Sequence, residues 1–329
     1  MKVLCVLNPL SGGGLALQRW PHVVDLFKSF GISYERLADS GNPIERQVLQ
    51  RLESGSPSEF DAIAGIGGDG TQSAAINGLM AYSTSHPEST LPPYGFIPVG
   101  VGNDIAKSFG LTSRADFLVD DLRRAVSTLV HGADYRLDLG LLNGRYFADA
   151  VTIGVDSHIL RDRNRQKRWM DRVPALRRFA GSAMLYTSVC WSRIWKHTPR
   201  NAEVKVDGAV WYAGPVMNLI INNTRIYAGE FDFCTGGAGN DGLLDVILFT
   251  GQRDYLGRYL LSLRYYPRNI RHMANKLARS SSHIQGRHIE ISLSQAEAAQ
   301  QDGEELPSCD RFDIRVAPNA IHIRTPAEP

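Results

Sequence analysis

Ile66-Gly67-Gly68-Asp69-Gly70-Thr71 decides the fold, because this stretch lies where an apolar run ends and a helix-compatible run begins. Residues 62–64 are apolar, and residues 72–79 suit a helix. Glycine at these positions lets the backbone approach a phosphate group closely and adopt positive φ values. The amides at the start of the next helix supply donors and the positive end of a dipole, and Thr71 adds a hydroxyl. The stretch therefore predicts a phosphate-binding turn between a strand and a helix.

Asp69 is the unusual member of this stretch, because a carboxylate repels phosphate unless it binds a metal, orients a lysine or a ribose, or accepts a proton. A single GGDG is equally consistent with an ordinary turn in which glycines only punctuate the chain. Asp69 is therefore a candidate catalytic residue as well as a candidate nucleotide-binding residue, and the neighbouring motifs must decide.

The length of 329 residues indicates a globular protein of two domains, since a domain typically has about 150 residues. The net charge of +2 gives no case for a nucleic-acid partner. Met1-Lys2 runs directly into an apolar strand, without a signal segment, and no apolar run reaches the ~18 residues of a membrane-spanning helix. We expect a cytoplasmic protein whose contact with a membrane is peripheral.

The four cysteines are scattered along the chain and form no CxxC pair; they are Cys5, Cys190, Cys234 and Cys309. This pattern argues against a zinc site and against a disulfide scaffold.

The first third of the chain alternates strand-like and helix-like segments. Strands are expected at residues 3–7, 32–37, 61–66 and 95–99, and helices at 18–30 and 43–52. This alternation predicts a parallel sheet with helices on both faces, in which ligands bind beyond the carboxyl ends of the strands. Three glycine-bearing loops fall at that edge, at residues 8–14, 67–71 and 100–104.

From about Leu137 the pattern changes to short strands separated by turns. These strands are expected at residues 146–153, 202–206, 210–212, 216–221, 244–249, 288–293 and 312–316. The pattern predicts an antiparallel β-sandwich, with a helical insertion at 176–195 and a further helix at 255–278. The open edges of such a sandwich are compatible with a homodimer.

Five motifs in a fixed order make the chain resemble the diacylglycerol kinase catalytic domain family of bacterial lipid kinases, which includes sphingosine kinases. They are Asn8-Pro9-x-Ser11-Gly12, Gly67-Gly68-Asp69-Gly70-Thr71, Gly100-x-Gly102-Asn103-Asp104-x-Ala106, Asp241-Gly242-x-Leu244-Asp245-Val246 and Asp302-Gly303-Glu304. The resemblance implies an α/β domain like that of NAD kinases and phosphofructokinases, followed by a β-sandwich. Residues 1–136, completed by 317–329, would form the first domain, and residues 137–316 the second.

The resemblance also implies ATP and Mg²⁺ as cofactors. The ATP phosphates would lie against Asn8, Pro9, Ser11, Gly12, Gly13, Gly67, Gly68, Asp69, Gly70 and Thr71, and the rim would be completed by Gly100, Gly102, Asn103 and Asp104. In the turn Asp302-Gly303-Glu304, a carboxylate would take the proton of the acceptor hydroxyl. Glu304 is the first choice for this base and Asp302 the second. Apart from the resemblance, the same turn reads as a solvated acidic hairpin.

A structural magnesium ion is implied at Asp241, together with the backbone carbonyls of Ala238 and Leu243. One carboxylate and two carbonyls suit magnesium, which prefers oxygen donors and keeps several waters. Asp-Gly is equally a plain turn signal.

The chain departs from the family pattern in three places. Gln72-Ser73-Ala74 replaces a hydrophobe, an asparagine and a glutamate, Val101 replaces a threonine, and Leu37 stands where a threonine is expected. These changes predict altered nucleotide affinity and a divergent branch with an unusual acceptor lipid.

Basic and aromatic residues gather in the second domain. The first group contains Arg161, Arg163, Arg165, Lys167, Arg168, Arg172, Arg177 and Arg178, with Trp169, Trp191 and Trp195 in it or just after it. The second runs from Arg253 to Arg279 beside Tyr255, Tyr259, Tyr265 and Tyr266. Basic residues near anionic lipid contribute about 1 kcal/mol each, and tryptophan suits the membrane interface. Residues 161–195 are therefore predicted to dock on an anionic membrane as a lid; a solvated basic face with core tryptophans is the alternative.

The leading interpretation is an ATP-dependent kinase that phosphorylates a hydroxyl of a diacylglycerol-like lipid to give a phospholipid such as phosphatidic acid. An NAD kinase, which shares the GGDG loop, is the alternative enzyme. A third interpretation is a non-catalytic lipid or nucleotide sensor with the same fold. The acceptor lipid stays open.

Overall fold

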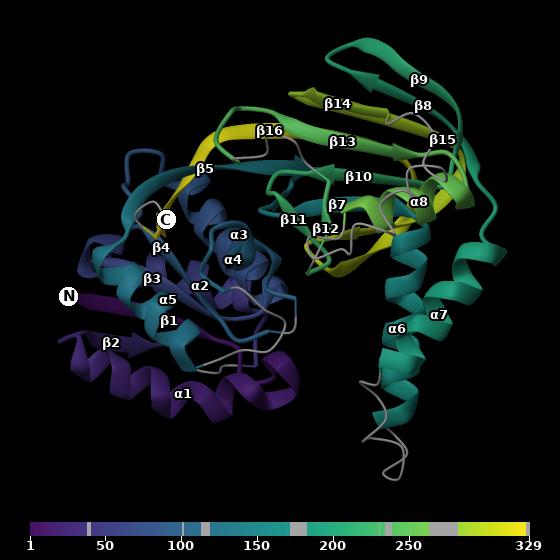
Figure 1. The fold of residues 1–329 in the computed structure, drawn as a ribbon. Helices are drawn as coiled ribbons and strands as arrows, with labels where there is room; N and C mark the ends of the chain where they lie inside the picture. Colours follow the sequence, from purple (N-terminus) through teal and green to yellow (C-terminus); the bar gives the residue numbers. More distant parts are fainter. Residues whose placement is uncertain are drawn as a thin grey trace.

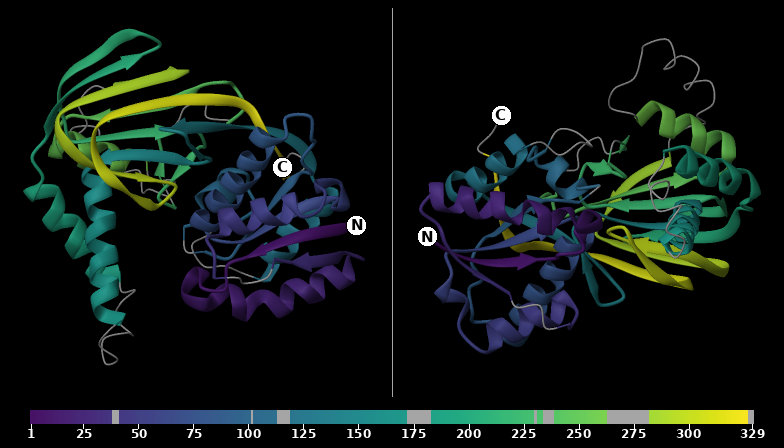
Figure 2. Two further views of the ribbon diagram at one scale, coloured as in Figure 1. Left: turned by 180° about the vertical axis from the view of Figure 1, so that it is seen from behind. Right: turned by 90° about the horizontal axis from the view of Figure 1, so that it is seen from below.

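A computed structural model describes the chain except for residues 38–40, 101, 113–118, 172–182, 230, 234–238, 263–281 and 327–329. The N-terminal part forms a sheet with helices on both faces, and the C-terminal part forms layered antiparallel strands (Figures 1 and 2). The predicted fold class is confirmed in both parts.

The N-terminal sheet is parallel and has the strand order β4-β3-β1-β2. The strands are β1 (Lys2–Leu7), β2 (Ser33–Arg36), β3 (Ala62–Gly67) and β4 (Tyr94–Pro98). One face packs on α1 (Ser11–Ser29) and α5 (Val119–His131), and the other on α2 (Ile44–Glu53) and α3 (Asp69–Ser85). Successive residues of a strand point to opposite faces. Val3 and Cys5 therefore pack into the core beneath α1 and α5, and Leu4 and Val6 pack into the core beneath α2 and α3.

The register of the strands brings the three glycine-bearing loops together. Leu7 pairs with Ile66, and Gly67 pairs with Pro98, so three neighbouring strands end at one edge. Gly68 and Gly100 then meet backbone against backbone: a Cβ atom on Gly100 would lie 2.3 Å from the Cα of Gly68. The prediction that these loops share one rim is confirmed, and glycine is required there because any side chain would separate two of them.

The sandwich has two layers that share two long strands, β15 (His288–Gln301) and β16 (Glu304–Thr325). One layer contains β7 (Ala150–Gly154), β10 (Asn218–Asn222), β13 (Leu244–Phe249) and β14 (Ser282–Gly286); the other contains β5 (Ala133–Leu142), β6 (Arg145–Phe147), β8 (Arg200–Val206) and β9 (Ala209–Val216). The first part of β15 pairs with β8 and its end with β7, with register shifts between Ser292 and Ala299. This irregularity lets one strand serve both layers.

β16 connects the sandwich to the parallel sheet. It pairs with β15 and β5, and Ile323 near its end pairs in parallel with Tyr94 of β4. This pairing supports the proposal that residues 317–329 complete the domain formed by residues 1–136.

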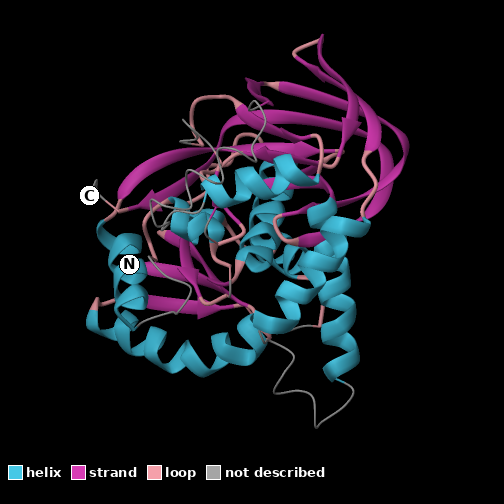
Figure 3. Ribbon diagram, turned by 45° about the vertical axis from the view of Figure 1, so that its right-hand side comes forward, coloured by secondary structure: helices cyan, strands magenta, loops and turns pink. Residues whose placement is uncertain are grey.

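Smaller elements line the junction and the outer surface. They are η1 (Pro57–Glu59), α4 (Asp104–Ser108), the hairpin of β11 (Ile226–Tyr227) and β12 (Phe231–Asp232), and α8 (Gln252–Ser262). Two longer helices, α6 (Val155–Asp171) and α7 (Ala183–Lys196), pack on each other and project from the sandwich (Figures 1 and 3).

Several predicted boundaries were wrong. The helical insertion begins at Val155 and not near residue 176, because α6 is rich in charged residues and has few apolar positions to mark a helical face. The predicted strand 146–153 is interrupted at Ala148 and Asp149. α8 covers the start of the predicted helix 255–278, and residues 263–278 lie outside the described residues. α1 begins at Ser11, within the predicted loop 8–14, but Gly12 to Gly14 keep positive φ values.

Replacing Gly100 by alanine tests the contact between the second and third loops. The added methyl would overlap the backbone at Gly68, which cannot turn away as a side chain can. We expect Gly100→Ala to lower the free energy of unfolding by about 1–3 kcal/mol, measured by thermal or urea denaturation. Gly251→Ala is the control, because a Cβ there meets nothing within 4 Å. Equal melting temperatures for the two variants would contradict the close approach.

Candidate active site

The first and second glycine loops form one hydrogen-bonded unit. Asn8 Nδ2 donates to Thr71 Oγ1 at 3.1 Å, and the Ser11 hydroxyl lies 3.0 Å from the same oxygen. The backbone N–H of Gly68 donates to Ser11 Oγ at 3.2 Å. Beside these contacts, Gly12 and Gly13 have φ values of 61° and 71°, which favour glycine. The structure therefore brings together the predicted residues of both loops.

The third loop is shaped by its own asparagine. Asn103 is buried with φ 54°; its Oδ1 accepts from the Gly100 N–H, and its Nδ2 donates to the Gly100 carbonyl, both at 2.9 Å. The predicted Asn103 thus fixes the loop backbone with its side chain. Residue 101, the predicted departure from the family pattern, lies outside the described residues.

Asp69 and Asp104 face each other across this rim. Backbone N–H groups at residues 103, 104 and 105 donate to the Asp69 carboxylate, yet burial raises its pKa. Burial and the charge of Asp69 raise the pKa of Asp104 to about 8, although Lys107 lies nearby. Asp104 Oδ1 is buried and has no hydrogen-bond partner among the described residues. An unpartnered buried oxygen next to a second carboxylate suits a cation.

Asp149 forms a group of four carboxyls with Asp69, Asp104 and Asp302. The sequence did not predict Asp149 as a site residue. It is 4% exposed, lies in the break between β6 and β7, and accepts from Thr224 Oγ1 at 2.5 Å. Burial and then the charges of Asp104, Asp302 and Asp69 raise its pKa well above the ordinary value. The only sequence signal was an acid within an otherwise apolar strand pattern.

The two carboxyls of the acidic turn between β15 and β16, Asp302 and Glu304, have different surroundings. The Asp302 carboxylate accepts from the backbone N–H groups of Ala148, Asp149 and Ala150 at 3.1, 2.9 and 3.2 Å. Burial nevertheless raises the pKa of Asp302 to about 6. This carboxylate is therefore engaged in holding the turn against the β6–β7 break.

Glu304 lies directly against the second glycine loop. A Cβ atom on Gly70 would lie 2.4 Å from Glu304 Oε1, so glycine makes room for the carboxylate. Partial burial of its carboxyl group raises the pKa of Glu304, while the charge of Arg145 lowers it. The turn thus carries the Glu304 carboxylate to the rim formed by the three loops.

The predicted structural-magnesium residues lie at a separate turn. The Leu243 N–H donates to Asp241 Oδ1 at 3.0 Å, and Ala238 lies outside the described residues. Asp138, which the sequence reasoning missed, is fully buried beside this turn and accepts from the N–H groups of Gly242 and Asn319 at 2.7 and 2.6 Å. Its carboxylate ties the turn to β16.

The departures from the family pattern have local partners. Gln72 Nε2 donates to the carbonyls of Gly65 and Gly67 at 3.1 and 3.3 Å, and its Oε1 accepts from Tyr94 at 2.6 Å. Ser73 makes a hydrogen bond with the Asp302 carboxylate. Leu37 packs on the apolar core. Gln72 and Ser73 therefore support the glycine loop and the acidic turn from behind.

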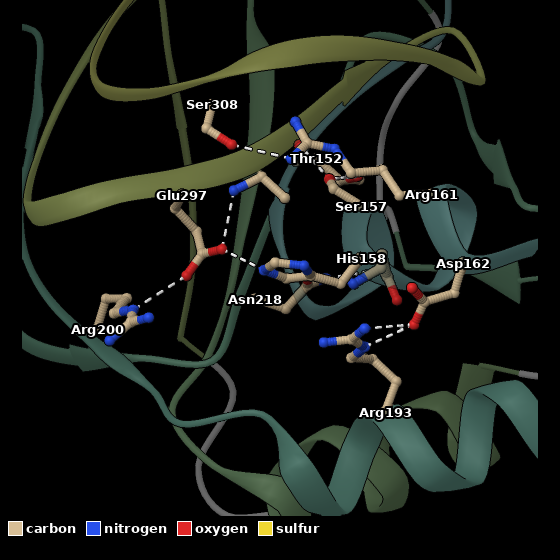
Figure 4. Close-up of polar contacts among 12 residues, drawn as sticks. Thr152, Ser157, His158, Arg161, Asp162, Arg193, Arg200, Asn218, Glu297 and Ser308 are labelled. Atoms are coloured by element: carbon tan, nitrogen blue, oxygen red, sulfur yellow. Dashed lines mark hydrogen bonds and ion pairs between the residues drawn. The ribbon is translucent and has the colours of Figure 1, made fainter. Parts of the chain in front are cut away.

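The predicted docking segment is tied to the acidic turn. The Arg161 guanidinium donates to Ser308 Oγ at 2.9 Å (Figure 4) and to the carbonyl of Leu306. Asn164 donates to Glu305 at 2.7 Å, and Arg168 lies 3.8 Å from the same carboxylate. α6 is therefore packed along the strand that begins at Glu304.

Three tryptophans of this segment are exposed: Trp169 by 58%, Trp191 by 60% and Trp195 by 54%. The alternative to membrane docking, a solvated basic face with core tryptophans, is therefore wrong about the tryptophans. Tyr255, Tyr259 and Arg258 of the second basic group point inward instead: both tyrosines hydrogen-bond to Asp156, and Arg258 covers the ring of Phe249. None of the described helices is both long enough and apolar enough to cross a membrane.

Comparisons with known proteins agree with this architecture. The family model described as "Diacylglycerol kinase catalytic domain" matches residues 2–140, and the one described as "YegS C-terminal NAD kinase beta sandwich-like domain" matches residues 150–325. A diacylglycerol kinase of Bacillus subtilis (strain 168) is 24% identical over 243 residues, which cover 74% of this chain and 72% of that protein. A "Probable lipid kinase YegS-like" of Citrobacter koseri is 26% identical over 321 residues, covering 97% of this chain and 95% of that protein.

Solved structures show the same fold. Two crystal structures from Bacillus anthracis (str. Sterne), described as "a putative diacylglycerol kinase" and as a diacylglycerol kinase, align with TM-scores of 0.69 and 0.64. Their identities are 18% and 17%, and the alignments cover 98% of this chain and 96% of those chains. With the two family models spanning most of the sequence, the chain belongs to the diacylglycerol kinase catalytic-domain family with a YegS-type C-terminal sandwich, and it is a lipid kinase.

Proposed function

We propose that the protein transfers the γ-phosphoryl group of ATP to a hydroxyl of a diacylglycerol-like lipid, giving a phospholipid such as phosphatidic acid. The observation that carries the proposal is the contact of Glu304 with Gly70. This contact brings a carboxylate of the sandwich to the rim of glycine loops on the parallel sheet. Phosphoryl transfer depends mainly on positioning and on charge stabilisation. A rim of glycine backbone with one general base is suited to both.

The assignment of the base follows from the hydrogen bonds of the turn. An alcohol needs a carboxylate within hydrogen-bond reach to accept its proton. Three backbone N–H groups occupy the oxygens of Asp302, whereas Glu304 Oε1 faces the glycine loop. We therefore assign Glu304 as the general base and Asp302 as the residue that positions it. Asp69 belongs to the group of carboxyls that would hold the metal–nucleotide.

Magnesium fits the residues at the rim. Asp104 offers a buried oxygen that has no hydrogen-bond partner among the described residues, and the carboxyls of Asp69 and Asp149 raise the negative potential around it. These carboxyls would hold the ion, with Asn103 shaping the loop behind them. When bound with ATP, magnesium neutralises the charge of the transferring phosphates. Lys107, which donates to the Gly229 carbonyl at 3.0 Å, holds the β11 turn over the same site.

The second metal site is part of the proposal. Asp241 would supply a carboxylate oxygen, and Ala238 and Leu243 would supply carbonyls, as the family resemblance implies. The buried Asp138 beside this turn adds negative charge, which favours a cation there. Such an ion would be structural, because it would lie at the turn that Asp138 ties to Asn319 of β16, whereas Glu304 lies against Gly70.

Membrane contact through α6 and α7 would give the kinase access to its lipid. The rings of Trp191 and Trp195 meet edge to face, with their centroids 5.8 Å apart, on an exposed helical surface. Arg163 and Arg165 are exposed on the neighbouring helix. An exposed aromatic pair with basic neighbours suits an anionic bilayer surface. This arrangement also favours a lipid over NAD as the acceptor.

Replacing Glu304 tests the assignment of the base. Glu304→Gln keeps the size of the side chain and removes its basicity, so we expect the rate of lipid phosphorylation to fall about 10²- to 10⁴-fold with ATP affinity unchanged. Turnover is measured with diacylglycerol in mixed micelles, and affinity by calorimetry. Glu305→Gln, one residue along the same strand, is the control and should keep most of the activity. Full activity in Glu304→Gln would exclude this residue as the base.

The raised pKa of Asp104 makes stability depend on pH. Because its folded-state pKa of about 8 exceeds the ordinary value of 3.8, its stabilising contribution is fully present below about pH 4 and is lost as pH rises toward 8. Asp104→Asn removes this titration. In magnesium-free buffer, we expect the melting temperature of the variant to fall less than that of wild type between about pH 5 and about pH 8.5.

The control for this comparison is Asp310→Asn, which changes an exposed carboxyl of β16. Its melting temperature should follow that of the wild type across the same pH range. Parallel curves for Asp104→Asn and wild type would contradict the raised pKa.

Removal of the exposed tryptophans tests membrane docking. We expect the double change Trp191→Ala and Trp195→Ala to weaken binding to vesicles that contain anionic lipid by about tenfold or more, because each ring buries apolar surface on docking. Binding is measured by co-sedimentation, and the wild type should bind less as salt rises. Leu17→Ala removes an equally exposed apolar side chain on α1 and is the control. Absent or salt-insensitive binding of wild type would exclude the docking model.

A further inference from the structure

Two histidines and a glutamate meet where the projecting helices join the sandwich. His158 lies on α6, and Glu297 lies at the irregular point of β15 (Figure 4). His197 directly follows α7. His158 Nε2 is 2.5 Å from Glu297 Oε1, and the two imidazole centroids are 5.3 Å apart. One candidate ligand atom from each residue lies within 4.8 Å of the other two. Three elements that are distant in sequence therefore bring three metal-ligand groups to one point.

The imidazole of His197 is buried at this point without full hydrogen bonding among the described residues. The residue is only 7% exposed, and its Nε2 has no hydrogen-bond partner among the described residues. A buried polar atom left without a partner is destabilising, and native proteins rarely keep one without a reason. Glu297 is 4% exposed, so its carboxylate is also enclosed. A cation bound by His197, Glu297 and His158 would give His197 Nε2 the partner that it lacks among the described residues.

We propose that His158, His197 and Glu297 bind a divalent transition-metal ion of the zinc class, which fastens α6 and α7 to β15. Two imidazoles and one carboxylate are a ligand set that zinc accepts, with a fourth position left for water. His158 is partly exposed and gives the ion a path to the site. The site is separate from the carboxyls at the glycine loops and from the turn at Asp241.

The surroundings of the three residues support this ligand set. Arg200 Nε lies 3.3 Å from Glu297 Oε2, and the Ala298 N–H donates to Glu297 Oε1 at 2.8 Å, so the carboxylate is oriented from behind. Arg193 of α7 pairs with Asp162 of α6 at 2.8 Å and holds the two helices together beside the site (Figure 4). Partners of this kind fix metal ligands in place.

The ion would require only small movements. Zinc bonds to nitrogen and oxygen are about 2.0–2.2 Å long, which separates tetrahedral ligand atoms by about 3.4 Å. The His158–Glu297 pair would open from its hydrogen-bond distance, and His197 would approach. The consequence is a metal clamp at the base of the helices that contact the acidic turn through Arg161 and Asn164.

Zinc titration of tag-free, chelator-treated protein tests the proposal. We expect the full-length wild type to bind one Zn²⁺ in calorimetry and to melt several degrees higher when it is bound. Binding should weaken at least about 100-fold in His197→Ala and in Glu297→Gln, the second of which preserves the side-chain size. His283→Ala is the matched control, because His283 pairs with Asp245 at 2.5 Å with no third ligand grouped with them among the described residues.

Two further measurements on the wild type do not depend on how the variants fold. Co²⁺ should give the intense visible bands of four-coordinate cobalt, and Zn²⁺ should slow backbone amide exchange near residues 155–162 and 193–197. The proposal is overturned if wild type binds no Zn²⁺, or if it binds with the same affinity when His197 or Glu297 is changed. It is also overturned if His288→Ala, in the more exposed group of His288, Glu290 and Asp313, removes the binding instead.

Discussion

The strand β16 is the constraint on which the rest of the structure depends. It begins at Glu304, which contacts the second glycine loop, and near its end Ile323 pairs with Tyr94 of the parallel sheet. Because both ends belong to one hydrogen-bonded strand, the acidic turn cannot move away from the glycine loops without breaking pairs in either sheet. The acidic turn is therefore held against the glycine loops by backbone pairing.

A second feature is the concentration of buried carboxyls at the junction. Asp69, Asp104, Asp149 and Asp302 all have raised pKa values, chiefly because burial disfavours their charged forms. Such a group opposes folding at neutral pH unless a cation or proton compensates it. The protein tolerates this cost at the place where a metal–nucleotide is expected, which is typical of functional sites.

The sequence predicted the fold class and the meeting of the three glycine loops, because period and turn chemistry are local signals. It did not predict α6, whose charged surface hides a helical pattern, or Asp149, whose importance depends on a break between two strands. The scattered cysteines argue against a zinc site built from cysteines, but they carry no information on His158, His197 and Glu297. These three residues meet only through tertiary packing, so no spacing rule could have grouped them. Likewise, the division of roles between Asp302 and Glu304 depends on which of them the backbone of β7 engages.

We propose that the rim formed by the glycine loops and Glu304 phosphorylates a lipid hydroxyl. The most direct measurement is transfer of labelled γ-phosphate from ATP with magnesium to diacylglycerol in mixed micelles and, in parallel, to NAD. We expect labelled phosphatidic acid and no labelled NADP. Label in NADP, or label in neither product while other lipid alcohols are also refused, would contradict it.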